Sequence, residues 1–277
     1  MILRAGFIAA RILDNGGTGR VMAVFQRSAY VAFDGQLLCV AQSSLSDGPL
    51  MVRLQNLPIF CLGAEYMAPK ALRRVWRPPV PYGWTMSKLC HGLAAMQPAG
   101  KGREPAEGFS RFAMEEDVSR ACGSQEAKAA HMPIARLQEW LLGMFQGVEC
   151  PMPVEASALV GLGPGLTPSG DDFLGGAMVA AHSLGRSDIA ARLYRIVLAG
   201  KTGAISAAHL AAASEGAVSA PLHLLLNDIL CGRIANLSAR LHALNTMGHS
   251  SGWDAFAGVM AVLRAAVRSE GFRSRAA

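Results

Sequence analysis

The chain has 277 residues, carries a formal net charge of +6 at pH 7, and is 51% hydrophobic but only 17% charged. A chain this apolar can bury a substantial core, which excludes an intrinsically disordered protein. The basic residues are scattered apart from a tail with Arg268, Arg273 and Arg275, and they form no stripe with interleaved aromatics. We therefore expect no nucleic-acid partner, and a small anionic substrate fits the charge better.

The six cysteines, at positions 39, 61, 90, 122, 150 and 231, are widely spaced and form no CxxC motif. This spacing is not that of a zinc or redox site, so we expect reduced thiols in a cytoplasmic protein. The N-terminal segment is too weakly apolar for a signal peptide, and no window holds about 18 uninterrupted apolar residues. The sequence thus predicts no membrane association.

Residues 1–80 have the pattern of a small β-rich domain. Short runs of β-branched and aromatic residues are interrupted by Asp34-Gly35, which is a hairpin signal, and by the turn Asp47-Gly48-Pro49. Abundant alanine and glycine elsewhere favour closely packed helices. We expect five to seven short strands here, arranged as a small barrel or sandwich.

The segment RPPVPYGW (77–84) is a stiff connector, because the residue before each proline is disfavoured in a helix. Beyond it the apolar spacing becomes helical, apart from a polar loop at 98–108. The sequence therefore predicts an α+β protein with a β-rich domain at 1–80 and a larger α-helical domain at 81–277. Helices are expected at 85–96, 109–122, 126–147, 154–160, 169–184, 187–199, 202–214, 218–229, 232–246 and 251–268.

The most informative feature is a pattern that occurs twice. Residues 169–181, SGDDFLGGAMVAA, and 251–263, SGWDAFAGVMAVL, are identical at five of thirteen positions. Each copy begins an apolar helix and follows a turn-rich segment, GLGPGLTP at 161–168 and TMGHS at 246–250. Two helices with the same polar start predict two matching walls of one site.

The loop before the first copy has the composition of an anion-binding loop. Gly161, Gly163 and Gly165 allow positive φ angles and a close approach to a ligand, and the following helix start offers unpaired N–H groups. The candidate anion-binding residues are Gly163, Gly165, Thr167, Ser169 and Gly170, with Ser250, Ser251 and Gly252 in the second copy.

Both copies also match the capping box Ser-x-x-Asp, through Ser169 with Asp172 and Ser251 with Asp254. Capping alone would explain either copy. It does not explain the triple-glycine loop, the adjacent Asp171, or the second copy with His249 beside it. We therefore favour a functional site, with Asp171, Asp172, Asp254 and His249 as the candidate catalytic residues.

Three carboxylates near an anion-binding loop would repel a phosphate. A Mg²⁺ ion held by Asp171, Asp172 and Asp254 could bridge the two, although no cofactor is required by the pattern. Alternatively, the carboxylates accept hydrogen bonds from an amide or carbamoyl NH₂ group while backbone N–H groups hold the anionic end of the substrate. The residues leave both arrangements open.

A third segment, GKTGAISAAHL (200–210), lies between the two copies. It is not a Walker A loop, because Arg195 occupies the position where that motif requires its first glycine. Thr202 and Ser206 lie four residues apart and share one helix face, with Lys201 near the start. These three residues either begin an ordinary helix or line the same pocket as the two copies.

In order and spacing, GLGPGLTPSGDDFLGG, TGAIS and GHSSGWDAFAG resemble the AllH family, and the resemblance spans most of the chain. It implies a component of a three-protein oxamate carbamoyltransferase of anaerobic allantoin breakdown, which converts oxalurate and phosphate into carbamoyl phosphate and oxamate. Partner subunits and an oligomeric complex are implied. The alternatives are a non-catalytic small-molecule-binding or scaffold subunit and a metal-dependent carboxylase- or hydrolase-like enzyme.

Overall fold

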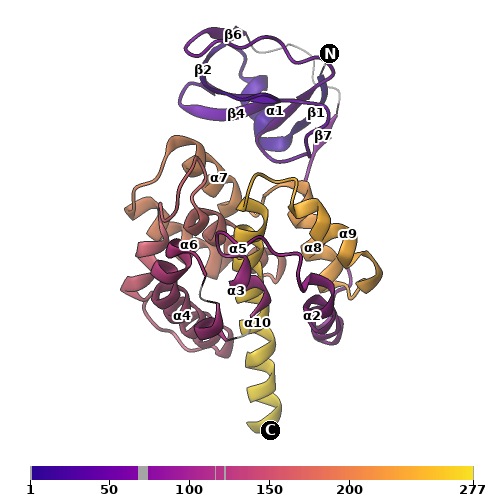
Figure 1. The fold of residues 1–277 in the computed structure, drawn as a ribbon, viewed down its shortest axis with the longest axis vertical. Coiled ribbons are helices and arrows are strands. Elements are labelled where there is room, and N and C mark those ends of the chain that lie inside the picture. Colours follow the sequence, from indigo (N-terminus) through magenta and orange to yellow (C-terminus); the bar gives the residue numbers. More distant parts are fainter. Residues whose placement is uncertain (1, 68–73, 116, 122, 277) are drawn as a thin grey trace. The chain divides into compact units, whose positions relative to one another are not determined.

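The structure is a computed structural model that describes residues 2–67, 74–115, 117–121 and 123–276 (Figure 1). Cys122 and the side chains of Arg273 and Arg275 lie outside the described part. The chain forms two compact units, one of residues 1–78 with 217–220 and one of residues 79–216 with 221–277. The predicted α+β class is confirmed. The division into domains at 1–80 and 81–277 remains our proposal, which limited proteolysis would test.

The first unit is a seven-stranded sheet with one helix. Its strands follow the order β6-β2-β3-β4-β5-β1-β7. Asp34 and Gly35 both have positive φ and form the predicted turn between β3 and β4, with Phe33 paired to Gln36. The elements are β1 (Ile2–Gly6), α1 (Phe7–Asp14), β2 (Thr18–Val24), β3 (Ser28–Phe33), β4 (Gln36–Gln42), β5 (Met51–Leu54), β6 (Glu65–Met67) and β7 (Val75–Trp76).

The predicted barrel or sandwich is wrong, because the sheet is open with β6 and β7 at its edges. The helix α1, which the sequence analysis did not predict, accounts for the difference. It packs against β4, β5 and β7, and it buries Ile8, Ile12 and Leu13. The apolar face of the sheet is therefore covered by a helix and needs neither closure nor a second sheet.

The second unit is helical. In Figure 1, α5 and α10 lie side by side at its centre, and α3 and α4 pack against α10. Its elements are α2 (Met86–Gly100), α3 (Ser110–Met114), η1 (Val118–Arg120), α4 (Gln125–Gln146), η2 (Val154–Leu159), α5 (Ser169–Ser183), α6 (Ser187–Ala199), α7 (Ala204–Ser214), α8 (Ala220–Leu230), η3 (Ile234–Asn236), α9 (Leu237–Leu244) and α10 (Ser251–Ala276). Within the described residues, none of these helices combines the length and hydropathy needed to span a membrane.

The two copies of the repeated motif are the starts of α5 and α10, and they cross through glycines. A Cβ atom on Gly176 of α5 would collide with the carbonyl oxygen of Ala255 in α10. A Cβ atom on Gly258 of α10 would collide with the carbonyl oxygen of Phe173 in α5. Because Gly176 and Gly258 hold the same position in the motif, and so do Phe173 and Ala255, the contact is reciprocal. The repeat thus encodes a close crossing with local two-fold character.

We predict that Gly176→Ala and Gly258→Ala each lower the free energy of unfolding by about 1–3 kcal/mol, because the added methyl group meets backbone that cannot yield cheaply. The matched control is Gly175→Ala in the same helix. Its Cβ would lie 3.7 Å from the Ala213 side chain, an ordinary contact, so the better helix propensity of alanine should leave stability unchanged or raised. Urea unfolding distinguishes them, and equal effects at positions 175 and 176 would contradict the crossing.

Candidate functional site

The structure brings the two motif starts together. Thr167, in the loop before α5, has its Oγ1 atom 3.0 Å from the Oγ atom of Ser251, the first residue of α10. These residues are far apart in the sequence, and the glycine crossing holds their helices at this separation. The amino ends of α5 and α10 therefore face one common region.

The serine and aspartate residues of the two motifs pair across this region. At α5 the N-cap is Pro168, with no side-chain cap, so Ser169 and Asp172 do not form the capping box that their spacing allows. Instead each serine acts on the aspartate of the other motif: the Ser251 side chain lowers the pKa of Asp172, and the Ser169 side chain lowers that of Asp254. Each motif thus supplies a serine to the aspartate of the other motif.

Asp172 is a half-buried carboxyl with an incomplete set of partners. Its Oδ2 atom is buried and forms no hydrogen bond within the described part of the chain. Burial raises the pKa of Asp172 well above its ordinary 3.8, and the negative charge of Asp254 raises it further. Hydrogen bonds from Ser251 and Thr167 oppose this rise. The Asp254 carboxylate is therefore close enough to influence the ionisation of Asp172.

Asp254 is 1% exposed. Its Oδ1 atom accepts a hydrogen bond from the Phe109 N–H group at 2.5 Å. Burial raises its pKa, while the hydrogen bonds from Phe109, Ser250 and Ser169 lower it. Among the described residues none of these groups hydrogen-bonds to Oδ2, which is buried and unpaired like that of Asp172. Each aspartate therefore has one acceptor atom left for a ligand.

A third segment that sequence reasoning missed completes this region. Gly108 has φ +68°, and a Cβ atom there would collide with the Asp254 carboxylate. The following Phe109 is buried, and its ring packs edge-on against Phe173 at 6.2 Å between centroids. The available signal was a glycine directly before an aromatic residue at the end of the polar loop, where backbone can approach another group closely.

Asp171 has a different role in the structure. It is 1% exposed, and both of its oxygen atoms are engaged. Oδ1 accepts from the Gly161 N–H group at 2.8 Å, and Oδ2 accepts from the hydroxyls of Thr202 and Ser206, the latter at 2.6 Å. Thr202 and Ser206 are thus brought to Asp171, which fastens the glycine loop and the start of α7 to α5.

The glycine loop adopts the conformation that its composition predicted. Gly161, Gly163 and Gly165 have φ angles of +73°, +114° and +91°. A Cβ atom on Gly163 would lie 2.9 Å from the backbone nitrogen of Ser169, so this glycine lets the loop fold against the helix start.

Backbone packing also explains the second residue of each motif. A Cβ atom on Gly170 would collide with the Leu159 carbonyl oxygen, and one on Gly252 would lie 2.5 Å from the Leu244 carbonyl oxygen. The Gly170 N–H group donates to the Leu162 carbonyl at 2.9 Å, and that of Asp172 to the Pro168 carbonyl at 3.0 Å. Those two N–H groups therefore serve the fold.

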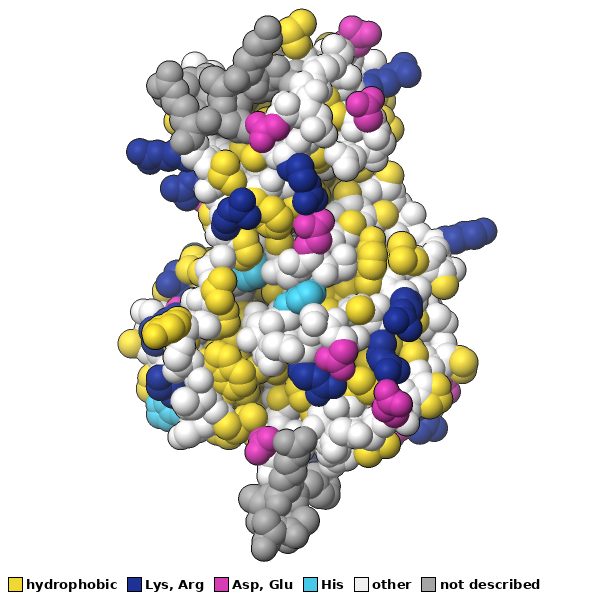
Figure 2. Space-filling model, turned by 180° about the vertical axis from the view of Figure 1, so that it is seen from behind, with side chains coloured by type: hydrophobic (Ala, Val, Ile, Leu, Met, Phe, Trp, Pro, Cys, Tyr) yellow, Lys and Arg dark blue, Asp and Glu magenta, His cyan; other side chains and the backbone are white. Residues whose placement is uncertain are grey.

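The basic candidates lie at the surface. The His249 side chain is 78% exposed, and its Nδ1 atom lies 3.2 Å from Glu107. Lys201 is exposed, and its carbonyl oxygen limits the space beside Gly161. On the face drawn in Figure 2, Lys and Arg side chains are dispersed among acidic and apolar ones and form no continuous stripe.

The three motif aspartates do not form one metal-binding cluster. Asp171 is saturated by its own hydrogen bonds, which leaves Asp172 and Asp254. A search of the described ranges finds no group of three or more His, Cys, Asp or Glu side chains arranged to hold a metal ion.

We predict that Asp172→Asn stabilises the protein at pH 7.5. The pKa of Asp172 in the folded protein lies above the ordinary 3.8 of an unfolded chain. Stability therefore falls as the pH rises from 3.8 to the folded-state pKa, and at higher pH the full loss remains. The advantage of the variant should therefore shrink as the pH falls toward 4. Chemical unfolding of both proteins at several pH values measures this advantage. A stability difference that does not change with pH would refute the raised pKa of Asp172 as its cause.

The contrasting control is Asp228→Asn, because Asp228 is buried but paired with Arg233 at 2.6 Å and Arg240 at 2.8 Å. Loss of these charge-assisted bonds should lower the free energy of unfolding by about 1–3 kcal/mol at pH 7.5. Both substitutions replace an aspartate with an asparagine, and their effects on the free energy of unfolding are expected to have opposite signs.

Comparison with known proteins supports the resemblance found in the sequence. The family model described as oxamate carbamoyltransferase subunit AllH matches residues 159–263, which include both motifs and the helices between them. No solved structure matches the chain. The paired aspartates, their serines and the glycine loop all lie within the matched segment, whereas Phe109 lies outside it. The segment that builds the crossing of α5 and α10 is therefore similar to the AllH family.

Proposed function

We propose that the chain is the AllH-like component of a carbamoyl-transferring enzyme that converts oxalurate and phosphate into carbamoyl phosphate and oxamate. One observation carries the proposal: two copies of a family motif converge so that Asp172 and Asp254 each keep a buried oxygen atom without a partner in the described chain. Buried polar atoms of folded proteins are normally hydrogen-bonded, and unpaired ones are typical of ligand sites.

The two carboxyl groups suit the carbamoyl end of the substrate. An NH₂ group has two N–H donors, and an ionised carboxylate offers acceptors only. The raised pKa of Asp172 favours its neutral form, which adds an O–H donor for the carbamoyl oxygen. A neutral Asp172 beside an ionised Asp254 therefore provides one donor and several acceptors, which is the pattern that an amide needs.

The helix starts suit the anionic end. The amino ends of α5 and α10 carry partial positive charge that stabilises a carboxylate or a developing oxyanion. The hydroxyls of Thr167, Ser169, Ser250 and Ser251 lie at these ends, with Gly163, Gly165, Gly170 and Gly252 shaping the backbone. In this proposal Asp171, Thr202 and Ser206 hold the loop, and the exposed Lys201 and His249 lie where phosphate or a partner subunit would approach.

The reaction needs few groups from this chain. An oxygen atom of hydrogen phosphate attacks the carbamoyl carbon of oxalurate and forms the new C–O bond. The bond between that carbon and the oxamate nitrogen then breaks. The proton that phosphate loses ends on the oxamate nitrogen, so atoms and charge balance. Asp172 and Asp254 orient the carbamoyl group, and the helix starts stabilise the tetrahedral intermediate.

We predict that Asp172→Asn and Asp254→Asn each lower kcat/KM for oxalurate phosphorolysis by roughly 10- to 100-fold, the effect of one charged hydrogen bond. The assay uses the chain together with its operon-encoded partner subunits and measures carbamoyl phosphate. The matched control is Asp188→Asn, which removes an exposed carboxyl paired with Arg186. Full activity in both motif variants would refute this assignment.

The alternatives have different outcomes in binding experiments. A scaffold subunit would be stabilised thermally by oxamate without turnover in the assembled complex. A metal-dependent enzyme would bind Mg²⁺ or Mn²⁺ in calorimetry, and this binding would be lost in Asp254→Asn. The amide-binding role predicts oxamate-dependent stabilisation and no tight metal site.

A further inference from the structure

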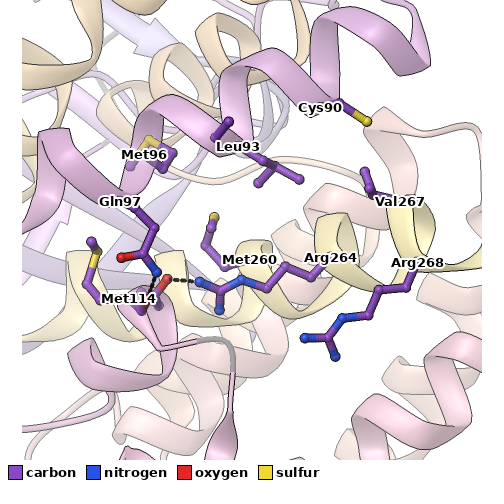
Figure 3. A pocket seen from close by; sticks show the side chains of 11 residues that line it. Cys90, Leu93, Met96, Gln97, Met114, Met260, Arg264, Val267 and Arg268 are labelled. Carbon is purple, nitrogen blue, oxygen red and sulfur yellow. Dashed lines mark hydrogen bonds between the residues drawn. The ribbon is translucent and has the colours of Figure 1, made fainter. Parts of the chain in front are cut away.

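The short helix α3 is held at its carboxyl end by side chains from two other helices. Arg264 of α10 donates from Nη1 to the carbonyls of Phe112 at 2.9 Å and Glu115 at 2.8 Å, and from Nη2 to that of Ala113 at 2.7 Å. Gln97 of α2 donates to the Met114 carbonyl at 2.5 Å (Figure 3). Carbonyls at a helix end have no partner within the helix, and here all four have side-chain donors.

The amino end of α3 is held by the candidate site itself. Phe109 immediately precedes α3, and its N–H group donates to Asp254 Oδ1. Asp254 and Arg264 both belong to α10, and their ten-residue separation corresponds to roughly 15 Å along that helix. One rigid helix therefore holds both ends of α3.

This double attachment matters because α3 cannot hold its own position. A helix of five residues is far below the length that is stable alone in water. Its location depends on the burial of Phe109 and Phe112 and on the polar contacts at its two ends. If the carboxyl end were released, the Phe109 N–H group would lose its fixed direction toward Asp254.

Arg264 itself suits this task better than lysine would. Its planar guanidinium directs several N–H groups at once and reaches three carbonyls, whereas an ammonium group is a single point with flexible donors. It also borders a pocket of about 330 Å³ between α2, α3 and α10, together with Met96, Met260 and Arg268 (Figure 3).

We propose that Arg264 is a positioning residue of the candidate site, which anchors the carboxyl end of α3 and thereby fixes the Phe109 N–H group on Asp254. The orientation of the Asp254 carboxylate, and hence of its unpaired Oδ2 atom, then depends on a residue about three helical turns away. The linkage from Arg264 through α3 to Asp254 is a property of the fold. Only the importance of the Asp254 orientation for catalysis rests on the proposed function.

The test follows the Phe109 amide in protein labelled with ¹⁵N-phenylalanine, which gives ten backbone signals at most. Phe109→Leu assigns the signal, and Asp254→Asn defines how it changes when the bond is lost. We expect Arg264→Met to move the signal in the same direction and to speed its hydrogen exchange at least tenfold. Arg264→Lys should give a smaller change. The matched control Arg136→Met removes an exposed arginine paired with Glu139 on α4 and should change neither quantity.

The proposal is overturned if Arg264→Met folds and keeps the parental Phe109 shift and exchange rate. Should that variant not fold, Arg264→Lys and Gln97→Leu decide, because each removes part of the anchor; parental Phe109 signals in both would equally overturn it. Oxalurate phosphorolysis by the assembled complex is measured separately. A displaced Phe109 amide with full activity would support the linkage and contradict the proposed function.

Discussion

The reciprocal contact of α5 and α10 is the constraint on which the rest of the second unit depends. Gly176 and Gly258 bring each helix against the backbone of the other. This approach sets the two helix starts beside each other, with Thr167 in contact with Ser251. It also lets a serine of each motif act on the aspartate of the other motif. A larger residue at either glycine would collide with the backbone of the other helix and push the two helices apart.

The buried aspartates of this unit differ in how completely they are satisfied. Asp171 is surrounded by hydrogen-bond donors, and Asp228 is paired with two arginines. Asp172 and Asp254 have fewer donors, the charge of Asp254 raises the pKa of Asp172, and each retains an oxygen that has no partner among the described residues. The hydrogen bond from Phe109 accounts for Asp254 Oδ1, but neither Oδ2 atom has a partner among the described residues. Unpaired buried acceptors lower stability, and such local costs are expected at functional sites.

Much of this organisation could be predicted from the sequence, because it depends on local pattern. The Asp34-Gly35 hairpin, the helices at 169–184 and 187–199, and the positive φ angles of the glycine loop follow from turn chemistry and apolar spacing. The repeated motif also indicated that two helix starts belong together. The predictions that were wrong concern tertiary structure. The helix α1 covers the sheet that was expected to close into a barrel or sandwich, and Pro168 is the N-cap of α5 in place of Ser169.

The polar contacts could not be predicted for the same reason. Asp171 and Asp172 are neighbours in one motif, yet Asp171 fastens a loop and Asp172 faces Asp254. Which of the two faces Asp254 depends on the rotation of the helix and not on residue type. Phe109 contributes through its backbone N–H group, and Arg264 acts on backbone carbonyls of α3. A backbone N–H or carbonyl group has no signature in a sequence. Only the three-dimensional arrangement connects a polar loop at 98–108 to a motif at 251–263.

The most direct test of the central claim is a double-mutant cycle on the two carboxyls at pH 7.5. Free energies of unfolding are measured for Asp172→Asn, Asp254→Asn and the double variant. If the carboxyls share one region, replacing Asp254 removes the charge that raises the pKa of Asp172, so the effect of Asp172→Asn on stability changes. The double variant should then differ from the sum of the single effects by more than about 0.5 kcal/mol. Additive effects would mean that the two motifs are separate helix starts and do not form one site.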